Sequence, residues 1–119
     1  MKKILIVDDS LFMRKVLGDI LSKEYQVIEA DSGSRALALA EQENPDLVLL
    51  DIIMRADEEE GVGVLEKLMN TSPDIQVVMI SAVGQQAMVE KCRRLGAKDY
   101  IVKPFDGKAV LQIVSEHVG

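Results

Sequence analysis

Residues 47–51 read LVLLD, which is four consecutive branched apolar residues followed directly by a carboxylate. A continuous apolar run, in place of an alternating one, indicates a strand that is covered on both faces, as in a parallel sheet. Other short apolar runs lie on either side of it along the chain: Ile4–Val7, Val27–Ile28, Ile75–Ile80 and Tyr100–Val102. The sequence therefore predicts five buried parallel strands.

The segment that follows each run carries apolar residues at helical spacing. In the first segment the apolar face is formed by Phe12, Val16, Leu17, Ile20 and Leu21. Ser10 is placed to cap the beginning of this helix. The other helices are expected near residues 33–43, 64–71, 85–95 and 108–117.

Strand and helix thus alternate five times, and the connections are short enough only for direct turns. Right-handed crossovers between parallel strands then give a doubly wound α/β fold with helices on both faces of the sheet. Five such units favour a five-stranded parallel sheet with the flavodoxin-like strand order 2-1-3-4-5. No linker or repeat interrupts the pattern, so residues 1–119 are expected to form one domain.

The composition argues against several classes of protein. A net charge of −6 does not favour direct binding of nucleic acid or of an anionic membrane by this chain. No apolar stretch approaches the roughly 20 residues of a membrane span, and the first apolar run is too short for a signal peptide. A cytoplasmic location is therefore expected. The single cysteine, Cys92, is expected to be an apolar residue on a helix face.

Polar residues follow four of the five predicted strands. Asp8 and Asp9 follow the first, Asp51 the third, Ser81 the fourth and Lys103 the fifth. In an open parallel sheet, ligands bind beyond the carboxyl ends of the strands, where the strand order switches. We therefore expect these five side chains to face one crevice.

The chemistry of these five residues points to phosphoryl transfer. Crowded carboxylates repel each other unless a cation neutralises them, and hard oxygen ligands suit Mg²⁺ or Mn²⁺. A nucleophilic carboxylate at Asp51, with Lys103 and the Ser81 hydroxyl to stabilise phosphoryl oxygens, supplies the remaining parts. Taken singly, each of these residues is as often a helix cap or a solvated charge, so the prediction depends on the combination.

Four motifs carry a resemblance to a known family: VDDS at 7–10, LLDI at 49–52, SA at 81–82 and KPF at 103–105. In this order they resemble the response-regulator receiver family, the CheY-like domains of two-component signalling. The resemblance covers essentially the whole chain, which implies a receiver domain over residues 1–119.

The resemblance implies a role for each site residue. Asp51 would accept a phosphoryl group from the phosphohistidine of a sensor histidine kinase or phosphotransfer protein, and Ser81 and Lys103 would hold its oxygens. The metal, Mg²⁺ or Mn²⁺, would be bound directly by Asp9, Asp51 and the main-chain carbonyl of Ile53, and through water by Asp8. The chain would catalyse only its own phosphorylation and dephosphorylation and would otherwise be no enzyme.

The resemblance also implies a switch. Tyr100 would turn inward as Ser81 moves towards the phosphate, and the surface of the fourth helix, fifth strand and fifth helix would change for a downstream partner or output domain. Alternatively, Tyr100 only shields the edge of the sheet. The exposed residues expected on this surface are Gln85, Gln86, Glu90, Arg93 and Lys108. A phosphorylation-dependent dimer rests on family analogy alone, and the sequence leaves open whether the chain acts alone or belongs to a longer regulator.

Two features depart from the family or vary within it. Arg55 stands where the family usually has proline, and the acidic run Asp57–Glu60 lies in a loop that is about two residues longer than usual. This loop is either solvated and mobile, or it tunes metal affinity or kinase choice. Ile53 and Val83 occupy positions beside the path of an attacking water, and because neither can orient water, slow self-dephosphorylation is predicted.

Other functions fit the residues less well. A hydrolase of the haloacid dehalogenase type would need an acidic residue two positions after Asp51, where Ile53 stands. A dinucleotide site would need a glycine-rich first turn in place of residues 8–10. A degenerate receiver that acts as a phosphate-independent interaction module is the main alternative, although the complete set of site residues argues against it. His117 is interpreted as a surface residue without a partner.

Overall fold

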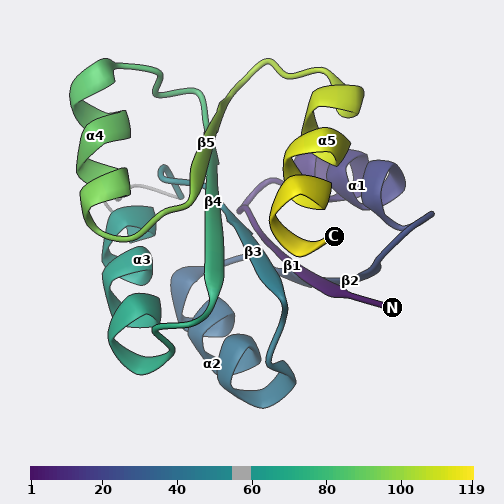
Figure 1. The fold of residues 1–119 in the computed structure, drawn as a ribbon, viewed down its shortest axis with the longest axis horizontal. Coiled ribbons are helices and arrows are strands. Elements are labelled where there is room, and N and C mark those ends of the chain that lie inside the picture. The colour runs from purple at the N-terminus through teal and green to yellow at the C-terminus, as the bar shows by residue number, and fades with distance from the viewer. Residues whose placement is uncertain (55–59) are drawn as a thin grey trace.

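The computed structural model describes residues 1–54 and 60–119, which form alternating strands and helices (Figure 1). The strands are β1 (Lys3–Val7), β2 (Gln26–Ala30), β3 (Leu47–Leu50), β4 (Gln76–Ser81) and β5 (Asp99–Val102). The helices are α1 (Leu11–Leu21), α2 (Gly33–Glu43), α3 (Glu60–Thr71), α4 (Gln86–Arg94) and α5 (Gly107–Val118).

The strands form one parallel sheet in the order β2-β1-β3-β4-β5, which confirms the predicted fold. The order reverses at β1, so β1 and β3 are neighbours although α1, β2 and α2 separate them in the chain. In the register of the sheet, Val7 pairs with Leu50, and Leu50 pairs with Met79. The carboxyl ends of β1, β3 and β4 therefore lie close to one level.

Helices cover both faces of the sheet, with α1 and α5 on one face and α2, α3 and α4 on the other (Figure 1). Successive residues of a strand point to opposite faces. In β1, Leu5 and Val7 pack with the α2–α3–α4 layer, while Ile4 and Ile6 pack with the α1–α5 layer. Since both faces are buried, the strands need the continuous apolar runs seen in the sequence.

The prediction that Phe12 packs against the core is wrong, because 74% of this residue is exposed. The packed row of α1 is formed by Met13, Leu17 and Leu21, which are spaced four residues apart and so lie on one side of the helix. Phe12 is one position before this row, which turns it about 100° away from the sheet. The predicted Ser10 cap is confirmed, since its Oγ accepts a hydrogen bond from the Met13 amide at 3.2 Å.

The sequence also predicts the environments of Cys92 and His117. Cys92 is fully buried on α4, as predicted. His117 was expected to have no partner, and this is wrong: its Nε2 lies 3.3 Å from Asp99 Oδ2, and its main-chain carbonyl accepts a 2.6 Å hydrogen bond from Gln76 Nε2. The contacts arise because the end of α5 packs beside the start of β4 and β5. No described helix is long and apolar enough to cross a membrane.

Candidate metal and phosphoacceptor site

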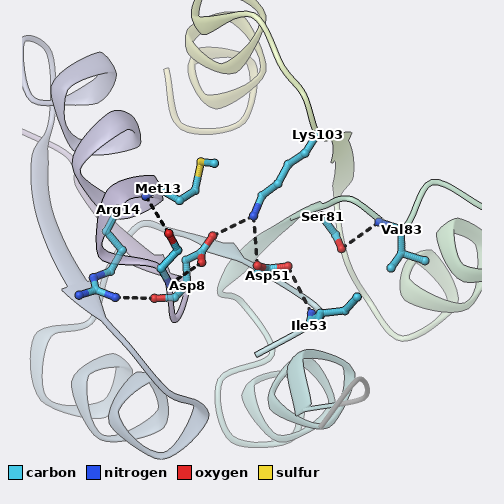
Figure 2. Close-up of polar contacts among 9 residues, drawn as sticks. Asp8, Met13, Arg14, Asp51, Ile53, Ser81, Val83 and Lys103 are labelled. Atoms are coloured by element: carbon cyan, nitrogen blue, oxygen red, sulfur yellow. Dashed lines mark hydrogen bonds and ion pairs between the residues drawn. The ribbon is translucent and has the colours of Figure 1, made fainter. Parts of the chain in front are cut away.

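The predicted site residues converge at the carboxyl ends of the strands (Figure 2). Asp8 follows β1 and Asp51 follows β3, and the Asp51 amide donates to the Val7 carbonyl at 3.0 Å, which extends the pairing of the two strands. Ser81 ends β4 on the other side of β3, and Lys103 follows β5. Four strands thus deliver side chains to the same edge of the sheet, as the topology requires.

Three carboxylates form a cluster that can hold a metal ion. Asp8, Asp9 and Asp51 each offer one oxygen, and these oxygens all lie within 4.8 Å of one another. Asp8 and Asp51 are buried, whereas Asp9 is exposed. Buried and solvent-facing carboxylate oxygens together fit a hard divalent cation that keeps part of its water shell, which is the coordination that Mg²⁺ prefers.

Lys103 joins the two buried carboxylates. Its Nζ lies 2.9 Å from Asp8 Oδ2 and 3.1 Å from Asp51 Oδ2 (Figure 2). Burial lowers the pKa of Lys103, but the hydrogen bonds to Asp8 and Asp51 and the charges of both carboxylates outweigh it and raise the pKa above its ordinary value. Lys103 therefore remains a cation at neutral pH. The peptide bond between Lys103 and Pro104 is cis.

Asp51 lies in an environment that disfavours its charge. Burial raises the pKa of its carboxyl, the charge of Lys103 opposes this, and the negative charge of Asp8 raises the pKa further. The net pKa is above the ordinary value for aspartate. The Ile53 amide donates to Asp51 Oδ1 at 3.3 Å and orients the side chain. A divalent cation between the carboxylates relieves the same repulsion, so the charges of the site fit a metal.

The β1–α1 loop is held in shape by local hydrogen bonds. Asp8 Oδ1 accepts from the Ser10 amide at 2.9 Å, and the Asp8 amide donates to the Ala30 carbonyl at 3.1 Å. The Asp8 carboxylate thus accepts a hydrogen bond from its own loop at Oδ1 and one from Lys103 at Oδ2. Asp8 is therefore a fixed part of the site.

Ser81 and Tyr100 meet at Val83 in the β4–α4 loop. The fully buried Ser81 accepts a hydrogen bond from the Val83 amide to its Oγ at 3.2 Å. The Tyr100 hydroxyl donates to the Val83 carbonyl. Tyr100 is half-buried and packs against the core on the α4 side of the sheet, and burial raises the pKa of its phenol. A movement of Ser81 would therefore disturb the loop that holds Tyr100.

Several other predicted features can be placed. Ile53 is 38% exposed and Val83 is half-buried, so both are partly open to solvent near the site. The five residues expected on the α4–β5–α5 surface are all exposed: Gln85, Gln86, Glu90, Arg93 and Lys108. Arg55 and most of the acidic run lie outside the described residues, and at the end of that run Glu60 begins α3.

Sequence reasoning missed residues on α1 at the rim of the site. Leu11 is 57% exposed and Phe12 is 74% exposed, which makes an apolar surface just after the acidic loop. Arg14 donates from Nη1 to the main-chain carbonyl of Asp8 at 2.7 Å. Helical spacing alone does not separate Phe12 from the packed row, because Phe12 and Val16 are also spaced four residues apart. The contact of Arg14 needed the three-dimensional structure.

Comparisons with known proteins show the family of this chain. The profile of the response regulator receiver domain matches residues 4–115, and the chain therefore belongs to that family. It is 40% identical over 117 residues to the chemotaxis protein CheY of Thermotoga maritima, with 97% of this chain and 96% of the relative covered. It is 35% identical over 118 residues to the sporulation initiation phosphotransferase F of Bacillus subtilis, with 98% and 94% covered.

Solved structures show the same fold. A CheY-like receiver domain from Methanospirillum hungatei superposes with a TM-score of 0.92 at 29% identity, covering 99% of this chain and 94% of the other. CheY of Borrelia burgdorferi, solved in a complex with CheX, BeF3 and Mg²⁺, superposes with a TM-score of 0.90 at 38% identity, covering 97% and 87%. The chain is a receiver domain of two-component signalling, and its Asp8–Asp9–Asp51 cluster suits Mg²⁺.

Proposed function

We propose that this chain accepts a phosphoryl group on Asp51 from the phosphohistidine of a sensor histidine kinase or phosphotransfer protein. The observation that carries the proposal is the position of Lys103, whose Nζ bonds to Asp51 and Asp8 beside a cluster of three carboxylates. A nucleophilic carboxylate with a cation in contact and a metal cluster adjacent is the arrangement that phosphoryl transfer needs. The proposal treats residues 1–119 as one receiver domain.

The metal ligands proposed are Asp9, Asp51 and the main-chain carbonyl of Ile53, with Asp8 acting through water. Asp8 Oδ2 already bonds to Lys103 and its Oδ1 to the Ser10 amide, which favours an indirect role. Asp9 is exposed, and one oxygen each of Asp9 and Asp51 belongs to the cluster, which leaves both carboxylates available as direct ligands. Bound Mg²⁺ or Mn²⁺ would neutralise charge on the carboxylates and on the phosphoryl oxygens.

In the transfer step, one Asp51 oxygen attacks phosphorus and forms an acyl phosphate, while the bond from phosphorus to the donor's histidine nitrogen breaks. Lys103 would bind one phosphoryl oxygen, and its Nζ is already 3.1 Å from Asp51 Oδ2. The Ser81 hydroxyl would donate to another oxygen. Ile53 and Val83 present no polar side chain to a water molecule, so the phosphate would be lost slowly.

The output we propose is a change of the α4–β5–α5 surface. If Ser81 turns towards the phosphate, its bond with the Val83 amide is lost, and the loop that holds the Tyr100 hydroxyl shifts. Phosphorylation would thereby favour one of two packings of this surface. A downstream protein or an attached output domain would bind the changed surface. A second copy of the chain could also bind there, which would give a dimer through α4.

Intact mass spectrometry tests the proposal. The chain is incubated with acetyl phosphate with or without Mg²⁺, alongside Asp51→Asn and, as a matched control, Asp19→Asn on the exposed side of α1. One added phosphate is expected on the wild type and on the Asp19 variant, and only with Mg²⁺. If the wild type stays unmodified, the proposal fails and a phosphate-independent interaction module becomes the better account.

A further inference from the structure

Arg14 is enclosed between the acidic β1–α1 loop and β2. Its Nη1 donates to the Asp8 carbonyl at 2.7 Å (Figure 2), and its Nε donates to Glu29 Oε1 on β2 at 2.9 Å. Only 13% of the Arg14 side chain is exposed. A planar guanidinium that is bonded through two nitrogens to two separate segments has little conformational freedom. A solvated surface charge, in contrast, moves freely.

The carbonyl that Arg14 binds belongs to the peptide bond between Asp8 and Asp9. A hydrogen bond to this oxygen fixes the plane of that peptide. The direction in which both carboxylates leave the backbone depends on this plane. The other contacts of Asp8 fix its amide, through Ala30, and its side chain, through Ser10 and Lys103. Arg14 thus adds a bond at the Asp8 carbonyl to those that hold Asp8 in place, and it fixes the peptide from which Asp9 continues.

Charge and geometry predict opposite effects of Arg14 on a metal ion. A guanidinium beside the acidic loop repels a divalent cation, so its charge by itself weakens metal binding. The ion pair with Glu29 offsets part of this charge. The fixed geometry strengthens binding, because partners that hold ligands in place contribute strongly to metal affinity.

We propose that Arg14, anchored by Glu29, is a positioning residue for the metal site and that its geometric effect exceeds its repulsion of the ion. The inference rests on the proposed function, since it concerns the metal ion of that same site. Arg14 on α1 and Glu29 on β2 would thus both affect how tightly the Asp8–Asp9–Asp51 cluster binds a metal ion.

Calorimetric titration of the full chain with Mg²⁺, without a phosphodonor, tests this directly. Arg14→Ala should weaken binding about tenfold. Arg14→Lys should also weaken it, because one ammonium group cannot reproduce the two-pronged contact with Asp8 and Glu29. Lys15→Ala removes the same charge from an exposed neighbour on α1 and should leave the affinity within about twofold.

A double-mutant cycle tests the anchor. Glu29→Ala should weaken Mg²⁺ binding in the wild-type background and have little further effect when Arg14 is already alanine, since the two residues act as one unit. Phosphorylation by acetyl phosphate should need a higher Mg²⁺ concentration in Arg14→Ala but reach a similar rate at saturation. General structural damage would instead lower the saturated rate.

The outcomes separate the inference from the proposed function. If the wild type binds no Mg²⁺, the proposed metal site is wrong. If the wild type binds Mg²⁺ and Arg14→Ala binds it equally or more tightly, the geometric effect does not exceed the repulsion and the positioning role is wrong. If Arg14→Ala does not fold, Arg14→Lys and Glu29→Ala decide the question in the same titration.

Discussion

At the residue scale, the site is a balance of buried charges. Asp8 and Asp51 are both buried and share the single ammonium group of Lys103, so without a metal the pair keeps an excess negative charge. Because burial and Asp8 raise the pKa of Asp51 despite Lys103, the ionised carboxylate lowers the stability of the metal-free fold. Under the proposed function, Asp51 is therefore a residue whose ionised state would serve phosphorylation at the expense of stability.

We therefore expect Asp51→Asn to stabilise the metal-free protein at neutral pH. A raised folded pKa means that the folded state binds the proton more tightly than the unfolded state, so ionisation costs stability above the folded pKa. The cost disappears as the pH falls through the raised pKa to the ordinary aspartate range. Thermal unfolding with a chelator should show a melting temperature a few degrees (about 2–5 °C) higher for the variant at pH 7.

The same scans should show the two melting temperatures converging near pH 4, and added Mg²⁺ should raise that of the wild type alone. If the wild type is more stable than Asp51→Asn at pH 7 without metal, the bond to Lys103 stabilises the fold by more than burial of the Asp51 charge destabilises it.

Ile53 and Val83 lead to a prediction about the lifetime of the phosphate. Both side chains are partly exposed near the acceptor and neither can bind a water molecule. Ile53→Asn introduces a polar group that can orient an attacking water, and we expect dephosphorylation to accelerate about tenfold. The decay of the phosphorylated mass after removal of the donor measures this rate. A wild-type half-life of only seconds with Mg²⁺ would contradict the predicted slow loss.

At the element scale, α3 begins in direct contact with the end of β3. A Cβ atom at Gly61 would overlap the Asp51 carbonyl oxygen and lie 2.5 Å from the Ile52 Cα, and the Gly61 amide donates to the Ile52 carbonyl at 3.0 Å. Backbone atoms cannot move aside as a side chain can. The approach of the helix to the acceptor strand thus depends on the missing side chain.

Gly61→Ala should therefore disturb both stability and the site. We expect a loss of about 3 kcal/mol or more in the free energy of unfolding, because α3 must shift away from residues 51 and 52. Gly63→Ala is the matched control, since a Cβ there meets no atom within 4 Å. Urea unfolding of both variants measures the difference. Equal stabilities would show that the start of α3 accommodates the added methyl group.

The first turn of α1 supplies a prediction about the phosphodonor. Leu11 and Phe12 are exposed directly after the acidic loop, and we expect the donor protein of the proposed transfer to contact them. Phe12→Ser should leave phosphorylation by acetyl phosphate unchanged within about twofold. Transfer from a phosphorylated histidine kinase that uses the wild type should slow at least about fivefold, because a large apolar contact is lost. Equal kinase rates would exclude this surface from donor binding.

At the scale of the whole molecule, most of the fold follows from the pattern of the sequence. The apolar runs indicate strands that are buried on both faces of the sheet. The rule that crossovers between parallel strands are right-handed then allows few topologies. The five site residues could be placed together because strand ends meet at one edge of a parallel sheet. What the pattern could not supply was contacts between elements, such as Arg14 with Glu29 or His117 with Asp99. Phe12 was misplaced because helical spacing alone does not show which row faces the sheet.

The central claim, that Asp51 is the phosphoacceptor, is tested most directly by trapping the acyl phosphate chemically. The chain is phosphorylated with acetyl phosphate and Mg²⁺ and reduced with borohydride, which converts an aspartyl phosphate to homoserine, and the peptides are mapped by mass spectrometry. We expect homoserine at position 51 and unmodified aspartate at positions 8 and 9. Homoserine at another position, or at none, would contradict it.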